Sequence, residues 1–242
     1  MIDRDTIDRD TDVRDAGDRD AAVLERLLAT RHSCRAFRPD PVPDATIERI
    51  VAIAGRTASW CNAQPWQLEI TRGAATEAFR TAMSAHAAAA EEPVIDYDWP
   101  RAYEGVYLER RRLCGFALYE SLGIGRGDRA AYGRQAQENF RLFGAPHVAI
   151  VSSDDALGTY GAVDCGAFVA NFLTAATALG VATIAQAALA SHAGLVRAHF
   201  GLPRDRRIVC GISFGYADTD HPANRFRTER AGLDEVLRWH DG

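Results

Sequence analysis

Apolar residues recur three or four positions apart along much of the chain and form short unbroken runs in a few places. The first spacing places side chains on one face of a helix, whereas a short apolar run is typical of a buried strand. The helical spacing predicts helices over residues 21–30, 44–55, 76–90, 105–124, 129–143, 160–179 and 192–200. The apolar runs predict strands over residues 66–71, 146–152, 181–184 and 208–214.

The order of these elements favours an α+β fold. The strands are few and widely separated, and they do not alternate regularly with helices as they do in a parallel α/β sheet. The glycine-rich stretch 123–127 follows a predicted helix and lacks the G-x-G-x-x-G pattern, so we interpret it as a loop. A nicotinamide-binding Rossmann domain is therefore not expected.

The first 20 residues differ in composition from the rest of the chain. They hold eight Asp and four Arg, so most of the net charge of −5 lies there and the remainder is nearly neutral. Arg recurs every five residues in this segment, a period that fits neither a helix face nor a strand face. We expect a disordered or loosely helical tail over residues 1–20, with a partner-docking tail as the alternative.

Composition and motifs exclude several classes of function. The nearly neutral main part lacks the basic face that a nucleic-acid-binding protein needs, and no apolar run reaches the roughly 18 residues of a membrane span. The charged start of the chain does not resemble a signal peptide, so we expect a cytoplasmic protein. The chain has no lysine, which excludes Schiff-base and phosphate-loop lysines, and it has no metal-binding motif.

Residues 31–37, called the clamp below, form the most informative motif. Arg31, His32, Ser33 and Arg35 place two guanidiniums, an imidazole and a hydroxyl within five positions. Bidentate Arg groups suit phosphate oxygens and Ser adds a neutral donor, so this composition predicts a site for an anion. Taken alone, the same stretch could also form a solvated basic turn.

A second motif, residues 59–66, places amide side chains before a Pro-Trp step that leads into a predicted strand. The order of clamp, helix, amide-rich loop and strand resembles the nitroreductase family, flavoproteins that hold FMN at a dimer interface. The resemblance implies a central antiparallel-dominated sheet flanked by helices, in an intertwined homodimer. It also implies one FMN-binding domain over residues 21–242, in which a helical insertion, 84–130, forms a lid on the pocket and the C-terminal arm embraces the partner.

The resemblance assigns the clamp to the cofactor. Arg31 and Ser33 would hold the phosphate and ribityl side of FMN, and His32 occupies another position of the same motif. Arg35 would reach the N1/O2 edge of the flavin, where a cation stabilises the reduced form and so tunes the flavin. Towards the C-terminus, Arg225 and Arg227 would complete the phosphate site, with Arg227 the stronger candidate.

The second motif would reach the flavin from the partner subunit. Ser59, Asn62 and Gln64 match the loop of the family. Trp60 stands where a small residue is common, and three roles are open for it: narrowing the pocket, stacking on a substrate, or packing at the dimer interface.

Two further segments resemble the family. Asn139 matches an Asn that lies near the flavin pyrimidine. Residues 185–188 fall in a loop whose backbone N–H groups would face flavin N5, and the members assigned to the cofactor are Gln186, Ala187 and Ala188.

The implied activity is a ping-pong hydride transfer from NADH or NADPH, through flavin N5, to a small nitroaromatic or quinone-type acceptor. The flavin would perform the chemistry, so neither a catalytic side chain nor a metal is expected. Two alternatives stay open. One is a flavoenzyme of the same fold with flavin-cleaving or dehydrogenase-like chemistry, and the other is a non-catalytic FMN-binding protein.

Overall fold

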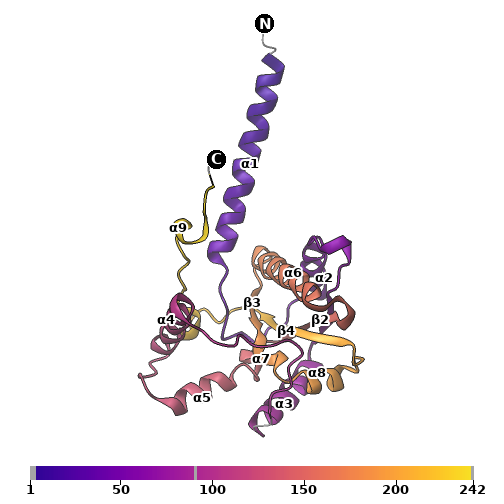
Figure 1. Ribbon diagram of the computed structural model, residues 1–242, viewed down its shortest axis with the longest axis vertical. Helices are drawn as coiled ribbons and strands as arrows, with labels where there is room; N and C mark the ends of the chain where they lie inside the picture. The colour runs from indigo at the N-terminus through magenta and orange to yellow at the C-terminus, as the bar shows by residue number, and fades with distance from the viewer. Residues whose placement is uncertain (1–3, 90–91, 241–242) are drawn as a thin grey trace.

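An antiparallel sheet forms the centre of the protein in the computed structural model, which describes residues 4–89 and 92–240, with side chains from Gly17 onward (Figure 1). The four strands lie in the order β1-β2-β4-β3. They span Gln67–Ile70 (β1), His147–Asp154 (β2), Ala182–Gln186 (β3) and Arg206–Gly215 (β4). Every neighbouring pair is antiparallel, which confirms the expected α+β fold and its sheet.

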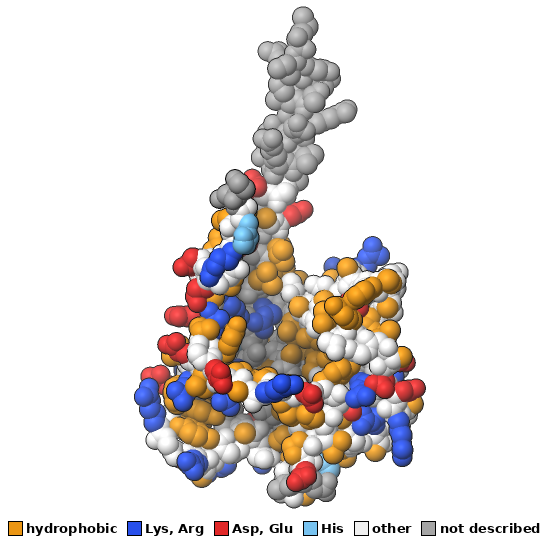
Figure 2. All heavy atoms as spheres, viewed as in Figure 1, with side chains coloured by type: hydrophobic (Ala, Val, Ile, Leu, Met, Phe, Trp, Pro, Cys, Tyr) orange, Lys and Arg blue, Asp and Glu red, His pale blue; other side chains and the backbone are white. Residues whose placement is uncertain are grey.

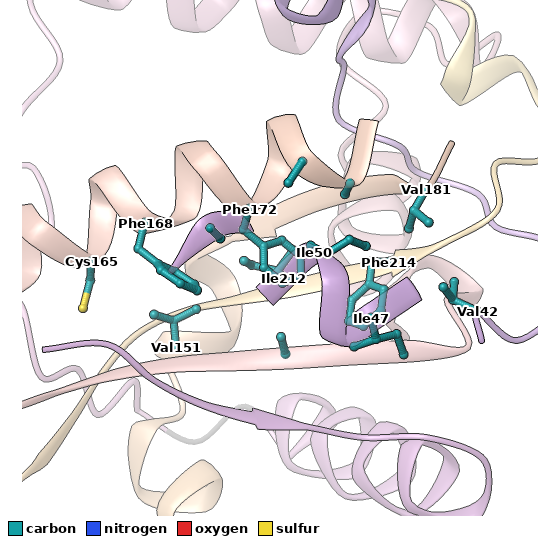
Figure 3. Packing of buried hydrophobic residues seen from close by; sticks show 14 residues of the cluster. Val42, Ile47, Ile50, Val151, Cys165, Phe168, Phe172, Val181, Ile212 and Phe214 are labelled. Atoms are coloured by element: carbon teal, nitrogen blue, oxygen red, sulfur yellow. The ribbon is translucent and has the colours of Figure 1, made fainter. Parts of the chain in front are cut away.

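Helices α2 (Asp44–Ala54) and α6 (Gly158–Ala178) cover one face of the sheet. Figure 3 shows how Phe172 of α6 and Ile50 of α2 meet Phe214 of β4 in this layer. All three side chains are fully buried. Burying side chains of this size stabilises the fold by about 1.5–3 kcal/mol each, so this cluster fixes α6 against the sheet.

The opposite face is covered by helices α3 (Ala74–Ala88), α7 (Ala187–Ala190) and α8 (Ala193–Phe200). Neighbouring residues of a strand point to opposite faces, so β2 sends Val151 to the α6 layer and Ile150 to the α3 layer. A strand that is buried on both faces is apolar at successive positions, which explains the unbroken run in the sequence.

Among residues 4–89 and 92–240, the α-helices outside these layers are α1 (Arg4–Thr30), α4 (Gly105–Ser121), α5 (Arg129–Gln137) and α9 (Leu233–Val236). In Figure 1, α1 projects from the body and the C-terminal segment with α9 runs beside it. The predicted helix 129–143 ends earlier, at Gln137. Leu142 and Phe143 have φ of 56° and 51°, a left-handed conformation that an α-helix cannot contain.

The N-terminal segment, for which a disordered or loosely helical tail is expected, is helical in the structure from residue 4 onward. Residues 4–20 belong to the same helix as residues 21–30, while residues 1–3 lie outside the described part of the chain. The five-residue repeat has no helical period of apolar residues, but it places Asp5, Asp10 and Asp15 four positions before an Arg. Acid-first pairs at this spacing in a sequence favour a helix.

One described segment, Asp155–Ala178, is long and apolar enough to cross a membrane by length and composition alone. It consists mainly of α6, which carries Asp164 and packs against the sheet and α2. Part of its apolar composition is therefore explained by the side chains that α6 buries in the core.

His147 ties the loop before α2 to the edge of the sheet. The ring is 1% exposed and stacks on Phe214 at a centroid distance of 5.1 Å. Val42 N donates to Nε2 at 2.9 Å, and Nδ1 lies 3.0 Å from the Thr71 carbonyl oxygen, which can only accept. These partners require the neutral ring with its proton on Nδ1.

We predict that the stability of the protein falls as the pH drops below about 6.5. Burial lowers the pKa of His147 below its ordinary value of 6.5, despite the opposing effects of Thr71 and Asp44. In this range the unfolded chain binds a proton that the folded chain resists, so protonation favours unfolding. His32, whose pKa burial also lowers, contributes with the same sign.

Urea unfolding at several pH values measures this dependence. His147→Gln should flatten the stability curve below pH 6.5 without abolishing the slope, because His32 remains. An unchanged slope in His147→Gln would contradict the assignment to His147.

We also predict that Gly211→Ala destabilises the protein by about 1–3 kcal/mol. A Cβ at Gly211 would lie 2.3 Å from Cδ1 and 3.2 Å from Cβ of Leu189, so the buried Leu189 side chain, or α7 with it, would have to shift. Gly133→Ala is the control, because a Cβ there meets nothing within 4 Å on an exposed turn of α5 and should stabilise by up to about 1 kcal/mol. Equal thermal midpoints for the two variants would rule out the close approach.

Candidate functional site

A cavity of about 290 Å³ lies between the end of α1, the clamp, α4 and the segment that follows η4 (Pro222–Asn224). In Figure 2, blue side chains gather beside the hollow at the foot of the projecting helix. The polar and charged side chains around the cavity come from Arg31, His32, Ser33, Arg35, Arg227, Thr228 and Arg230. The structure thus brings together the four predicted clamp residues and one of the two predicted C-terminal cations.

The clamp continues the sheet beyond β3. Ser33 forms a parallel bridge with Thr183, and Cys34 N donates to the Thr183 carbonyl at 3.0 Å. Cys34 is fully buried, and burial raises the pKa of its thiol to about 11, so it packs as a neutral group. Alternate side chains of an extended segment point to opposite sides, so Ser33 and Arg35 share the cavity side.

The C-terminal segment lies against the other end of the clamp. Phe37 forms an antiparallel bridge with Ala217, and Arg38 N donates to the Tyr216 carbonyl at 2.8 Å. The guanidinium of Arg35 lies 5.3 Å from the ring centroid of Phe226 and donates to the Ser33 carbonyl at 3.2 Å. The guanidinium is thus held in place by a ring and a carbonyl.

The cavity holds cations without acids. No Asp or Glu lines it, and in the described part of the chain Arg31, Arg35, Arg227 and Arg230 belong to no ion pair. Burial, and then the nearby Arg230, lower the pKa of Arg31, and burial lowers that of Arg35. The same chain pairs other Arg residues with carboxylates, so this donor set fits a multiply charged anion such as a phosphate.

Arg225 does not line the cavity. Its guanidinium donates to the Asp220 carbonyl at 2.7 Å. Arg230, which the motifs did not predict as a site residue, lines the cavity instead. The segment after η4 has no regular secondary structure, so no period in the sequence distinguishes the Arg residues that face inward. The concentration of three Arg within six positions was the only available signal.

The second motif forms a separate, strained loop that does not line the cavity of its own chain. Cys61, Asn62 and Gln64 have φ of 50°, 56° and 48°, which is unfavourable for residues other than glycine. Gln64 N donates to the Ser59 hydroxyl at 2.9 Å and so closes the loop. Strain of this kind persists only where surrounding contacts enforce it, and it is concentrated at functional sites.

Helix α6 supplies the contacts that hold this loop. The backbone N–H of Trp60 donates to the carboxylate of Asp164 at 3.1 Å. The Trp60 ring meets Tyr160 edge-to-face at a centroid distance of 4.3 Å, and each side chain is 58% exposed. A large aromatic pair is therefore presented to the outside of the single chain.

Asn139 and Gln186 lie together in a third group. Gln186 Nε2 donates to the Asn139 carbonyl at 2.9 Å, and the Ser213 hydroxyl donates to Gln186 Oε1 at 2.5 Å. Gln186 is 2% exposed, so its side chain is committed to the protein.

The loop expected at residues 185–188 is instead the end of β3 followed by the first turn of α7. Ala187 and Ala188 lie in that turn, where backbone N–H groups have no acceptor within the helix. A second hollow of about 380 Å³ shares Arg35 with the first cavity and reaches Glu138, the neighbour of Asn139. Arg35 thus lines both hollows.

The family model described as "Nitroreductase family" matches residues 28–216. This chain belongs to the nitroreductase family, as its motifs suggested. The matched range begins just before the clamp and ends just after β4.

The chain is 38% identical to nitroreductase NfnB of Mycolicibacterium smegmatis over 221 residues, covering 90% of this chain and 93% of that protein. It is 30% identical to a 4-nitrobenzoate reductase of Nocardioides sp. strain LMS-CY, covering 90% of each. The crystal structure of the FMN-dependent NfnB from Mycobacterium smegmatis with NADPH matches with a TM-score of 0.85 and 37% identity, over 91% of this chain and 99% of that one.

We predict that inorganic phosphate raises the thermal midpoint of the cofactor-free protein. A ligand at 100 times its Kd stabilises the folded state by about 2.7 kcal/mol. Arg227→Ala should remove most of this shift, because it deletes a charge-assisted donor worth about 1.5–3 kcal/mol. Arg225→Ala is the matched control and should respond like the wild type. Equal shifts for the two variants, or an equal effect of chloride at the same ionic strength, would contradict the site.

Proposed function

We propose that this protein is an FMN-dependent nitroreductase that oxidises NAD(P)H and reduces small nitroaromatic or quinone-type acceptors. The observation that carries the proposal is the acid-free cationic cavity formed by the clamp and the C-terminal segment. Relatives named as a nitroreductase and as a 4-nitrobenzoate reductase, 38% and 30% identical over most of the chain, support the same activity.

The residues that line the cavity suit the phosphate end of FMN. Arg31, Ser33 and Arg227 supply guanidinium and hydroxyl donors, and Arg230 adds a further cation. A phosphate monoester carries a charge of about −1.5 to −2 at neutral pH, which offsets the repulsion among these groups. His32 Nδ1 lies 3.1 Å from the Thr30 carbonyl oxygen and so carries the proton of the neutral ring, which means that Nε2 donates to a phosphate only when the ring is protonated.

Beyond the phosphate, Arg35 is placed at the boundary between the two hollows. FMN, when bound, supplies the hydride-accepting and hydride-donating chemistry. The role of Arg35 is to offer positive charge to the flavin ring. Helix α4 contributes Cys114 to the wall of the cavity, which agrees with a covering role for the insertion.

We propose NADPH as the electron donor by analogy, since one related enzyme was crystallised with NADPH and another is described as FMN and NADPH-dependent. The same relatives favour the oxidoreductase over the two alternatives, a flavin-cleaving or dehydrogenase-like enzyme and a non-catalytic FMN-binding protein. The cytoplasmic location stays a prediction.

We further propose that the working unit is a homodimer. The strained loop with Trp60, Asn62 and Gln64 does not line the cavity of its own chain, so a second copy is needed to bring it to a flavin. Exposed apolar side chains that suit such a contact lie on α1, on α6 and on the C-terminal arm: Leu24, Leu28, Val163, Leu233, Val236 and Trp239.

The deciding experiment is an anaerobic absorption spectrum of the purified protein. We expect flavin bands at roughly 370 and 450 nm that bleach with NADPH and return when 4-nitrobenzoate is added. Flavin that stays oxidised with both NADPH and NADH would contradict the proposed activity and favour the alternatives. A colourless protein that FMN does not reconstitute would contradict the cofactor itself.

A further inference from the structure

Asn224, the last residue of η4, is a buried amide between the clamp and the C-terminal segment. Its side chain is 5% exposed. Oδ1 accepts from the backbone N–H of Arg35 at 2.7 Å. Nδ2 donates to the carbonyls of Ala36 at 2.9 Å and Asp218 at 2.7 Å. One side chain therefore joins two backbone segments that are 189 positions apart in the sequence.

The main chain of Asn224 contacts the other half of the cavity. Arg227 Nη1 donates to the Asn224 carbonyl at 2.8 Å. Phe226, whose ring lies under the guanidinium of Arg35, is two residues further along the chain. Asn224 thus holds both Arg35, through its backbone N–H, and Arg227, through its guanidinium. These two arginines face the cavity from opposite ends of the sequence.

We propose that Asn224 is a positioning residue that sets the orientation of Arg35 relative to Arg227 for FMN. The inference rests on the proposed function. Asn224 does not line the cavity, so it acts through these two arginines and does not touch the ligand itself.

The chemistry of the three hydrogen bonds requires an amide. The position needs one acceptor for an N–H group and two donors for carbonyl oxygens, and the asparagine side chain supplies this set. An aspartate keeps the acceptor but turns a carboxylate oxygen towards the carbonyls of Ala36 and Asp218. Asn224→Asp therefore breaks two of the bonds with almost no change in shape.

The test measures the Kd of FMN for the cofactor-free protein by quenching of flavin fluorescence. We expect Asn224→Asp and Arg35→Gln each to weaken FMN binding by about tenfold or more. The Kd of FMN for the double variant should be much lower than the product of the two single fold-changes predicts, because Asn224 acts through Arg35. A residue that only stabilises the fold would not show this coupling.

Thr76→Val is the matched control for loss of buried hydrogen bonds. Thr76 is 1% exposed, and its hydroxyl lies 2.9 Å from both the Thr71 hydroxyl and the Pro146 carbonyl, outside the cavity. This variant should lower the thermal midpoint and leave the Kd of FMN within about twofold of the wild type. If Asn224→Asp does not fold, Asn224→Ser takes its place. We expect its affinity for FMN to lie between that of the wild type and that of Arg35→Gln.

Three results would overturn the inference: an unchanged Kd in the folded Asn224 variant, fully multiplicative effects with Arg35→Gln, or equal weakening by Thr76→Val. In each case the wild type still binds FMN and the proposed function stands. A wild-type protein that binds no FMN contradicts the proposed function, and the inference falls with it.

Discussion

The antiparallel pairing of β3 with β4 is the constraint on which the site depends. The free edge of β3 holds the clamp through Thr183, and β4 leads directly into the segment that pairs with Phe37 and carries Arg227. A change in the β3–β4 register would move one side of the cavity relative to the other. A shift by one residue would also turn every side chain of the strand to the opposite face of the sheet. Gly215 allows the end of β4 to pack closely against Pro146, since a Cβ at this position would lie 2.6 Å from Cδ of Pro146.

The energetics of the cavity follow from its composition. Charges taken out of water destabilise the fold unless they are paired, and like charges that face one another add to this effect. The chain nevertheless places Arg31, Arg35, Arg227 and Arg230 around one cavity without an acid. The unfavourable interactions of the cofactor-free state are relieved when an anion binds, so part of the binding free energy of a phosphate comes from the protein itself. Local conflict of this kind is typical of functional sites.

Local signals in the sequence were sufficient for the strands and for the clamp, because apolar runs and adjacent Arg, His and Ser residues are visible without tertiary structure. They were insufficient where a distant contact decides the outcome. Ile208 and Ile212 are four positions apart, so a regular strand would place both side chains on the same face. They enter opposite layers, because the β2–β4 register shifts between Val151 and Ser152. Similarly, only the folded chain shows that Arg230 lines the cavity and that Arg225 does not.

The most direct test of the cationic cavity as the phosphate site is a ³¹P NMR titration of the protein with bound FMN. Free FMN changes its phosphate resonance as its second pKa, about 6, is passed. Nearby cations favour the dianion and lower that pKa, so we predict a bound resonance that does not titrate between about pH 5 and 8. A bound phosphate that titrates near pH 6, as in free FMN, would mean that the phosphate lies in solvent and would contradict its placement in this cavity.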